Sequence, residues 1–259
     1  MRRLLVLVGA LTSMGAHCAH VAPAPGGGPE VALQRMAERS AKMRNLRGFA
    51  SVTGWDAETT FKGKLLVVAE RPGRVHIQVL SPFDQPIAYL ATDGKTLDLY
   101  MLRSGRFLRG AATSDNLAKL LPMRIEPAVF VEALLGAPPL PHGADAKAAL
   151  QWDPQAAVYV LRYDDRPWPV AWLRPDDLAP THAGWLAPGD QRGWTLELWD
   201  YEGGAPKRLA FDHRTSGSGF ELTWDQVEFN VPDLPAETWR IEVPRGVQLE
   251  TLDGLPGSR

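Results

Sequence analysis

Residues 67–80 read VVAERPGRVHIQVL, and this stretch contains the pattern of a complete β-hairpin. In its second half, Val75, Ile77 and Val79 alternate with polar residues. An apolar side chain at every second position is typical of a strand with one buried face. Residues 71–73 (RPG) supply the proline and glycine of a tight turn. The stretch therefore predicts two antiparallel strands joined by a short turn.

The same two-residue period recurs on both sides of this hairpin, between short turn segments. We expect strands at 46–56, 61–70, 74–80, 86–92, 96–102, 148–152, 157–163, 168–174, 193–201, 207–212 and 220–230. Helices are expected at 29–45, 115–121 and 128–135. This order predicts a mainly β (α+β) fold: a curved antiparallel half-open β-barrel, with a helical lid over its concave apolar face.

The composition excludes several classes of function. The formal net charge is −2, with 28 basic and 30 acidic residues, which argues against nucleic-acid binding. The six histidines are scattered and none has a metal-ligand spacing, so no metal and no cofactor are expected. No motif indicates a nucleophile or an acid–base pair, so the sequence predicts a protein that is not an enzyme. An enzyme whose site the sequence does not reveal is the third of three hypotheses.

The N-terminal segment has the pattern of a secretory signal, with two arginines, a short apolar run and small residues behind it. Cys18 is the only cysteine and lies at the end of this segment, so residues 1–18 are interpreted as a lipoprotein signal and Cys18 as the lipid-attachment residue. His17 stands where small residues are usual, and the alternative is cleavage nearby without lipid, which gives a soluble periplasmic protein. Residues 19–28 are expected to form a flexible tether. Residues 29–259 are expected to form a single domain with a C-terminal extension, 231–259, that contains a further strand candidate at 238–243.

Several motifs resemble those of the lipoprotein-localisation factors. The hairpin of 67–80, followed by TDGKTL at 92–97, resembles the periplasmic outer-membrane lipoprotein carrier family, LolA. LLPMRIEPAVFVEALLGAPP at 120–139 and SPFD at 81–84 are more similar to the outer-membrane lipoprotein receptor family, LolB. The resemblance covers roughly residues 30–230 and implies a half-open barrel with a helical lid over an apolar cavity. The extension after residue 230 has no counterpart in the receptor pattern.

The resemblance also implies roles for two residues. Phe83 falls where the receptor family displays an apolar side chain on a membrane-insertion loop, although here Asp84 replaces the following glycine. The alternative places Phe83 in the core. Arg71 falls where the carrier family has an arginine that latches the lid, and the alternative is a turn arginine in solvent. Strand periodicity gives eight apolar candidates for the cavity lining: Leu66, Val68, Val75, Ile77, Val79, Leu97, Leu99 and Leu196.

These expectations describe a monomeric, lipid-anchored outer-membrane lipoprotein that faces the periplasm. Its partners would be the acyl chains of lipoproteins, a periplasmic lipoprotein carrier and the outer membrane. It would receive lipoproteins and insert them into that membrane without covalent chemistry. The alternative is an envelope lipoprotein on the same scaffold that acts as a sensor or a protein-binding adaptor, with its tryptophan-rich second half as the candidate protein-binding region.

Overall fold

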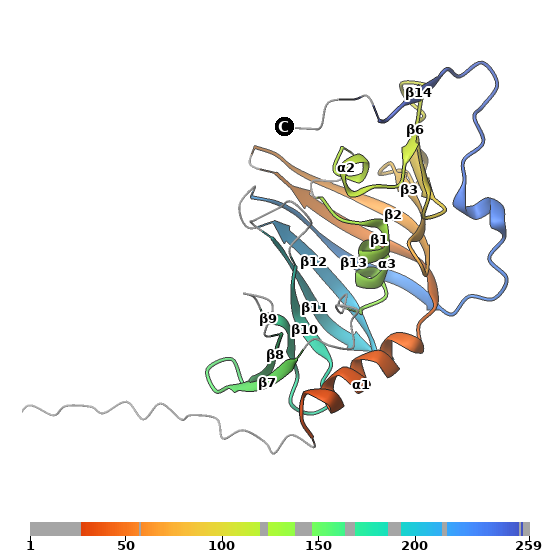
Figure 1. Cartoon of the computed structure of the whole chain (residues 1–259). Helices are drawn as coiled ribbons and strands as arrows, with labels where there is room; N and C mark the ends of the chain where they lie inside the picture. Colours follow the sequence, from red (N-terminus) through yellow and green to blue (C-terminus); the bar gives the residue numbers. More distant parts are fainter. Residues whose placement is uncertain are drawn as a thin grey trace, which may run out of the picture.

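The computed structural model describes residues 27–56, 58–119, 124–137, 147–163, 169–185, 193–213, 217–253 and 255. These residues form one large curved sheet with few helices (Figure 1). The strands before the mid-chain helices are β1 (Asn45–Trp55), β2 (Thr60–Glu70), β3 (Arg74–Leu80), β4 (Pro86–Thr92), β5 (Thr96–Met101) and β6 (Arg106–Ala111). The later strands are β7 (Ala148–Asp153), β8 (Val158–Tyr163), β9 (Pro169–Leu173), β10 (Pro180–Trp185), β11 (Trp194–Glu202), β12 (Ala205–His213), β13 (Ser218–Phe229) and β14 (Leu249–Thr251). The helices are α1 (Pro29–Ala41), α2 (Ser114–Leu117), α3 (Pro127–Leu134) and a 3-10 helix, η1 (Ala236–Trp239).

The strand order is β14-β6-β5-β4-β3-β2-β1-β13-β12-β11-β10-β9-β8-β7. Every neighbouring pair is antiparallel except β14 and β6, which are parallel. The two ends of the sheet, β14 and β7, do not pair with each other, so the barrel is not closed. The predicted fold class, a curved and open antiparallel sheet with few helices, is therefore confirmed.

Three strands were not expected from the sequence, namely β6, β10 and β14, and one expectation was wrong. The strand candidate at 238–243 is instead the end of η1 followed by an extended segment outside the sheet. Its backbone groups bond to side chains rather than to a strand. The Thr238 carbonyl oxygen bonds to the His76 Nδ1 atom at 2.8 Å, and the Ile241 amide donates to Asp98.

The concave face of the sheet carries the main hydrophobic core. Alternation in β3 puts Val75 and Ile77 on this face, and α3 packs against them with Phe130, Val131 and Leu134. The Phe130 ring centroid lies 6.0 Å from that of Phe211 and 6.2 Å from that of Phe220. Each such buried side chain stabilises the covered state by about 1.5–3 kcal/mol. The expected lid is thus an apolar helix that shares the core of the sheet.

Helix α1 packs against the other end of the sheet. Pro29 occupies its first turn, where proline is favoured, and the helix ends at Ala41, earlier than expected, shortly before β1 begins. Ala32 and Met36 form a second, smaller core with Tyr159, Leu161 and other residues of the β8–β9 region. Because α1 covers this smaller core and α3 covers the main one, different helices cover different parts of the same sheet.

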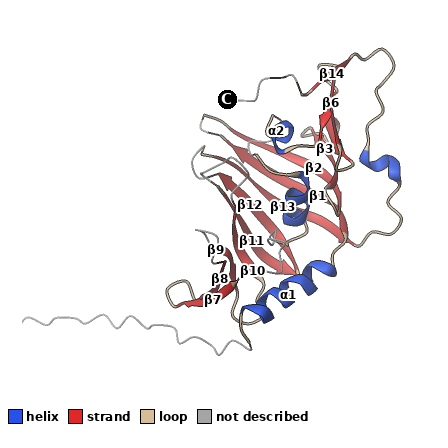
Figure 2. Cartoon of the chain, viewed as in Figure 1, coloured by secondary structure: helices blue, strands red, loops and turns tan. Residues whose placement is uncertain are grey.

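The segment from residue 231 onward crosses the outer face of the sheet. Figure 2 shows α2 and α3 on one side of the sheet and η1 on the other. Trp239 is buried, and η1 contacts β3 and β4. His76 bonds to this segment from β3, and burial lowers the pKa of its imidazole. The chain then reaches β6 as β14, and Leu252 joins the concave core.

Asp98 fixes this C-terminal segment to the sheet. Its fully buried carboxylate accepts two hydrogen bonds from Arg109, at 2.6 and 3.2 Å, and one from Arg240 at 3.2 Å. It also accepts the Ile241 amide at 3.1 Å. The hydrogen bond from Arg109 raises the pKa of that guanidinium. A buried carboxylate is stable only when paired and hydrogen-bonded in this way, so the segment and the sheet are coupled at this residue.

The coupling predicts a large effect of Asp98→Asn. The substituted amide would present NH2 donors to the guanidinium groups and would remove the charge that they neutralise. We expect the free energy of unfolding to fall by about 2–3 kcal/mol in urea denaturation, because breaking a buried ion pair leaves unsatisfied groups.

Glu228→Gln is the matched control. Glu228 pairs with Arg47 at 2.8 Å on the outer face, where both side chains are 54% exposed. The same change of carboxylate to amide should alter stability there by less than about 0.5 kcal/mol. Equal effects at the two positions would contradict the structural role given to Asp98.

Candidate functional site

The candidate site is the concave face beneath α3. Among the predicted lining residues, Val75, Ile77, Leu97 and Leu196 lie in the main core. Val79 and Leu99 are half-buried and pack against it. The structure thus brings these six side chains to one face of the sheet.

Leu66 and Val68 do not lie on this face, which corrects the expected orientation of β2. Leu65, Val67 and Ala69 occupy the concave face instead, and Leu66 lines a hollow on the outer face. Residues 65–68 are all apolar, so no alternation indicates which face is buried. A shift of one residue in a strand moves every side chain to the opposite face.

The lid covers the concave face unevenly. Val67, Val75 and Leu97 are essentially inaccessible, whereas Leu65, Val79 and Met101 are only half-buried. In the register of the sheet, Leu65 pairs with Val79 and Met101 pairs with Ala88, nearer the loops at 56–59, 81–85 and 102–105. The covered half adjoins the turn at 71–73. The concave face therefore has a closed half and a partly open half.

Arg71 holds the lid to the sheet. Its Nε and Nη2 atoms donate to the two carboxylate oxygens of Glu132 on α3 at 2.6 and 2.8 Å. Nη1 donates to the Ser40 carbonyl oxygen at 2.8 Å, and Nη2 also donates to the Ser40 hydroxyl at 2.8 Å. The alternative of a turn arginine in solvent does not describe this residue. Glu132 was missed from the sequence, although it is the only charged residue of α3 and an isolated acid in an apolar helix indicates an ion partner.

Two glycines let the lid approach the sheet closely at both ends. Gly73, with φ +72°, lies in the β2–β3 turn, and a Cβ atom there would be 3.1 Å from the Ala128 nitrogen at the start of α3. Gly136, also with φ +72°, follows α3, and a Cβ atom there would lie 2.3 Å from the Pro206 Cδ atom. A larger residue at either position would push the lid away from the sheet and strain the backbone.

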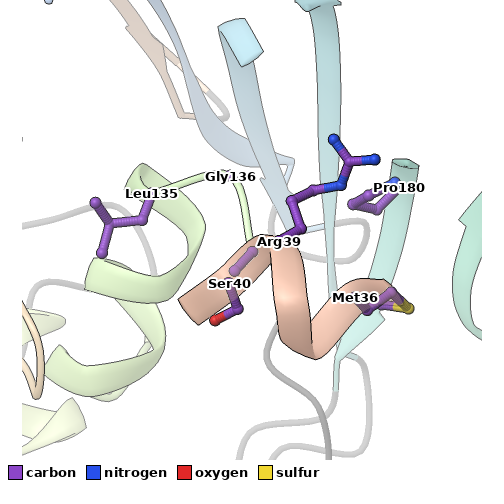
Figure 3. A pocket seen from close by; sticks show the side chains of 7 residues that line it. Met36, Arg39, Ser40, Leu135, Gly136 and Pro180 are labelled. Atoms are coloured by element: carbon purple, nitrogen blue, oxygen red, sulfur yellow. The ribbon is translucent and has the colours of Figure 1, made fainter. Parts of the chain in front are cut away.

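The junction between α1 and the end of the lid is tightly packed. Figure 3 shows Met36, Arg39 and Ser40 of α1 facing the segment after α3 and the start of β10. The hollow between these elements has a volume of only about 10 Å³, which is roughly the space for one water molecule. The C-terminal end of the lid is therefore closely packed against α1, and these contacts must separate before the lid can open.

The loop between β3 and β4 projects an apolar side chain into solvent. Phe83 is 85% exposed, so it is not folded into the core. The Ser81 hydroxyl accepts the Phe83 and Gln85 amides and so shapes the loop. Asp84 adopts φ 58°, the left-handed conformation that the glycine of the receptor pattern would favour.

The charge beside Phe83 is neutralised. The Asp84 carboxylate accepts a hydrogen bond from the Lys64 ammonium at 2.9 Å. This bond, together with the attraction of Asp84, raises the pKa of Lys64. An open hollow of about 580 Å³ lies next to this pair, with Phe49 and Leu66 among its lining residues. The exposed loop is thus apolar at its tip and carries a neutral ion pair at its base.

Other predicted features lie outside the described residues or have no counterpart within them. Cys18, the signal at 1–18 and the tether up to residue 26 fall outside the described part of the chain. Within the described ranges, no three acidic, histidine or cysteine side chains are grouped as metal ligands. The helices in those ranges are all too short or too polar to cross a membrane.

These features define a class of protein: an open, curved β-sheet with a short helix latched over its concave face. Solved structures share this fold at low sequence identity. A DUF1329 family protein from Desulfovibrio piger superposes with a TM-score of 0.53 at 12% identity, over 81% of this chain and 95% of that one. A LolA superfamily protein from Nitrosomonas europaea gives 0.52 at 13% identity, over 83% and 98%. An outer-membrane lipoprotein-sorting protein domain from Vibrio parahaemolyticus gives 0.50 at 14% identity, over 81% and 97%.

The fold is therefore LolA-like, and the structural similarity does not single out the receptor branch. No protein-family model matches the sequence, and no curated protein matches it either.

The geometry of Arg71 predicts the behaviour of Arg71→Gln. Without the bidentate ion pair, α3 would open more often, because charge-assisted bidentate bonds are among the stronger surface interactions. We expect the amides of 128–134 to exchange with deuterium at least about tenfold faster, while exchange in β11 and β12 stays unchanged.

Arg74→Gln provides the comparison on the same hairpin. Arg74 pairs with Glu70 at 2.9 Å within the hairpin, and this pair does not include the lid. Its loss should leave the exchange of α3 unchanged. Equal acceleration in the two variants would show that Arg71 acts on the hairpin and not on the lid.

Proposed function

We propose that this protein binds the acyl chains of lipoproteins between α3 and the concave face of the sheet, and transfers them to a membrane. The observation that carries the proposal is an apolar helix held over an apolar face by a charged, partly exposed latch. Phe130, Val131 and Leu134 of α3 occupy the space that acyl chains would take when the lid moves.

The energetics of acyl chains favour this arrangement. Burial of a chain contributes about 0.8 kcal/mol per CH2, so an acceptor for lipid needs a large apolar surface. Lid opening exposes such a surface on both α3 and the sheet, and bound chains would cover it again. The Arg71–Glu132 pair can break and re-form because water reaches it, with the two side chains 22% and 27% exposed. Binding and release then need no covalent step, and we propose that the protein is not an enzyme.

The solved proteins of this fold include one described as a lipoprotein-sorting domain and one of the LolA superfamily. These descriptions support a role in lipoprotein localisation for this chain. We further propose that Cys18 carries a lipid anchor in the outer membrane, that a periplasmic carrier delivers the cargo, and that Phe83 enters the membrane during transfer. The exposed Phe83 ring and the neutral Lys64–Asp84 pair support the last step.

A protein-binding adaptor has less support, because much of the tryptophan-rich half is used for packing. Trp152 makes an edge-to-face contact with Tyr159, Trp172 makes one with His182, and the Arg208 guanidinium lies over the Trp199 ring. Trp224 and Trp239 are buried. These side chains have structural contacts within the chain and do not form an unoccupied aromatic surface.

Native mass spectrometry of the full-length protein, extracted from its own membranes in mild detergent, tests the proposal. We expect a chain that begins at Cys18 and carries covalent diacylglyceryl and acyl groups. We also expect a second, non-covalent adduct with the mass of an acylated lipid or lipoprotein. An unmodified chain that begins after Cys18 would contradict the anchor, and absence of any adduct would contradict cargo binding.

A pair of variants identifies the face that binds the adduct. Val79 and Leu66 are both half-buried in neighbouring strands, but Val79 faces the concave core and Leu66 faces the opposite side. Val79→Glu should remove the adduct because a carboxylate is costly to bury against acyl chains. Leu66→Glu should retain it. The reverse result would place the site on the outer face.

Phe83→Glu should slow the transfer of bound lipoprotein to vesicles by roughly tenfold or more, because an acidic side chain does not enter the apolar part of a bilayer as an aromatic ring does. Loading with cargo and thermal stability should stay unchanged, since Phe83 is exposed. Transfer is followed by the movement of a labelled lipoprotein into sedimenting vesicles.

Phe49→Glu makes the same substitution on the outer face of β1, where Phe49 is 46% exposed and lines the hollow beside the Lys64–Asp84 pair without being part of the loop tip. This variant should transfer cargo at the wild-type rate. Normal transfer by Phe83→Glu would exclude this loop as the insertion element.

A further inference from the structure

Trp224 lies on β13 at the boundary between the covered and the open half of the concave face. In the register of the sheet, Trp224 pairs with Ala50 on β1. Ala50 pairs with Leu65 on β2, and Leu65 pairs with Val79 on β3. Leu65 and Val79 are the half-buried residues that mark the open half. Trp224 itself is 1% exposed and belongs to the main core.

The indole is pressed against the sheet at Gly48. A Cβ atom on Gly48 would lie 3.0 Å from the Cε3 atom and 3.1 Å from the Cζ3 atom of Trp224, so only glycine leaves room for the ring. The indole nitrogen is on the edge of the ring opposite to these two carbon atoms. The side chain as a whole belongs to a cluster of apolar side chains.

This N–H group has no hydrogen-bond acceptor among the described residues. Buried polar groups are normally paired, because an unpaired donor keeps the full cost of its desolvation. Three other buried side-chain atoms of the described residues also lack a hydrogen bond, namely Arg39 Nε, Asn45 Oδ1 and Arg208 Nε, but each of these side chains makes another polar contact, to Asp177, Val231 or Asp200. The indole N–H is the sole polar group of Trp224, so this side chain has no such contact within the described part of the chain. Other buried polar groups are paired. The Tyr201 hydroxyl donates to the Pro180 carbonyl oxygen, and the buried Asp98 accepts four hydrogen bonds. An indole that is fixed in place but unpaired is therefore a donor available to a ligand.

The surroundings limit which acceptor can reach it. A charged carboxylate or phosphate would need a cation, and the core around Trp224 consists of apolar side chains. A hydrocarbon chain offers no acceptor. The neutral acceptor that belongs to an acyl lipid is the ester carbonyl at the head of each chain. With the ester at Trp224, the chains would lie in the covered half and the headgroup would face the open half.

We propose that the Trp224 N–H group donates a hydrogen bond to the ester carbonyl of an acyl lipid bound beneath the lid, and so selects esterified chains and sets their depth. This inference rests on the proposed function, because it requires acyl chains on the concave face. The ester could belong to the diacylglyceryl group of a lipoprotein or to a membrane glycerolipid.

The test compares two probes with the full-length protein. Dipalmitoylglycerol has ester carbonyls, and dihexadecylglycerol has ether links with chains of the same length. We expect the wild-type protein to bind the ester about fivefold to tenfold more tightly than the ether, the usual effect of one hydrogen bond. Trp224→Phe should remove this difference by weakening ester binding alone.

Trp199→Phe is the matched control, since it also removes one indole but on the outer face, where Trp199 contacts Arg208. It should keep the preference for the ester. Binding of both probes with no ester preference, or a preference that survives Trp224→Phe, would overturn the role of Trp224 and leave the proposed function standing. Failure of the wild-type protein to bind either probe would overturn both.

An infrared measurement keeps the test decisive if Trp224→Phe does not fold. With a ¹³C-labelled ester, the carbonyl band should move to lower wavenumber on binding to the wild-type protein, relative to the same ester in alkane. An unshifted band would overturn the proposal. A comparison of S-(dipalmitoylglyceryl)cysteine with dipalmitoylphosphatidylglycerol then identifies the source of the ester, and a shifted band with either one supports the contact.

Discussion

A sheet that curves without closing leaves an apolar concave face, and this face must be covered. In this protein α3 covers it with Phe130, Val131 and Leu134, and the helix stays in place because Arg71 connects it to the β2–β3 turn and to α1. Hydrophobic contact supplies most of the stabilisation of the closed state, because it scales with buried area. The Arg71–Glu132 ion pair adds specificity to this packing, because a bidentate contact fixes the orientation of α3.

The two faces of the sheet are covered by different physical means. On the outer face, the C-terminal segment is fixed by Asp98, whose carboxylate is fully buried and accepts four hydrogen bonds. On the concave face, the Arg71–Glu132 pair is partly exposed to water. A buried charge network is costly to open, whereas an exposed pair exchanges easily with water. The outer cover is therefore more costly to displace than the inner cover, which supports the proposal that acyl chains bind beneath a movable α3.

The proposed path of a lipid follows from the placement of three features. The half-buried row of Leu65, Val79 and Met101 opens toward the same end of the sheet as the loop that carries Phe83. Trp224 lies at the inner limit of this row. Chains that enter from the membrane side would pass the loop first, then the open half, and would come under the lid beyond the indole. In the proposed path, one face of the sheet would thus carry the entry, the boundary and the enclosed half.

The amino-acid sequence by itself determined most strands, the two mid-chain helices and the concave face of β3 and β5. Alternation with a period of two is a local property, because each side chain's face follows from its neighbour's. The local pattern could not identify the buried face of a strand where apolar and polar residues do not alternate. Residues 65–68 are uniformly apolar, so Leu66 and Val68 were assigned to the wrong face. β6 was missed because it contains two charged residues, Arg106 and Arg109. Their acidic partners, Glu250 and Asp98, are known only from the folded structure.

Tertiary structure alone decided the contacts between residues far apart in the chain. The Arg71 partners are 31 and 61 residues away, and the Asp98 partners in the C-terminal segment are more than 140 residues away. No local pattern encodes such pairs, since they arise only when the sheet is assembled. The unpaired indole of Trp224 has the same origin. A tryptophan in a strand predicts burial, but whether its nitrogen finds an acceptor depends on every element that packs around it.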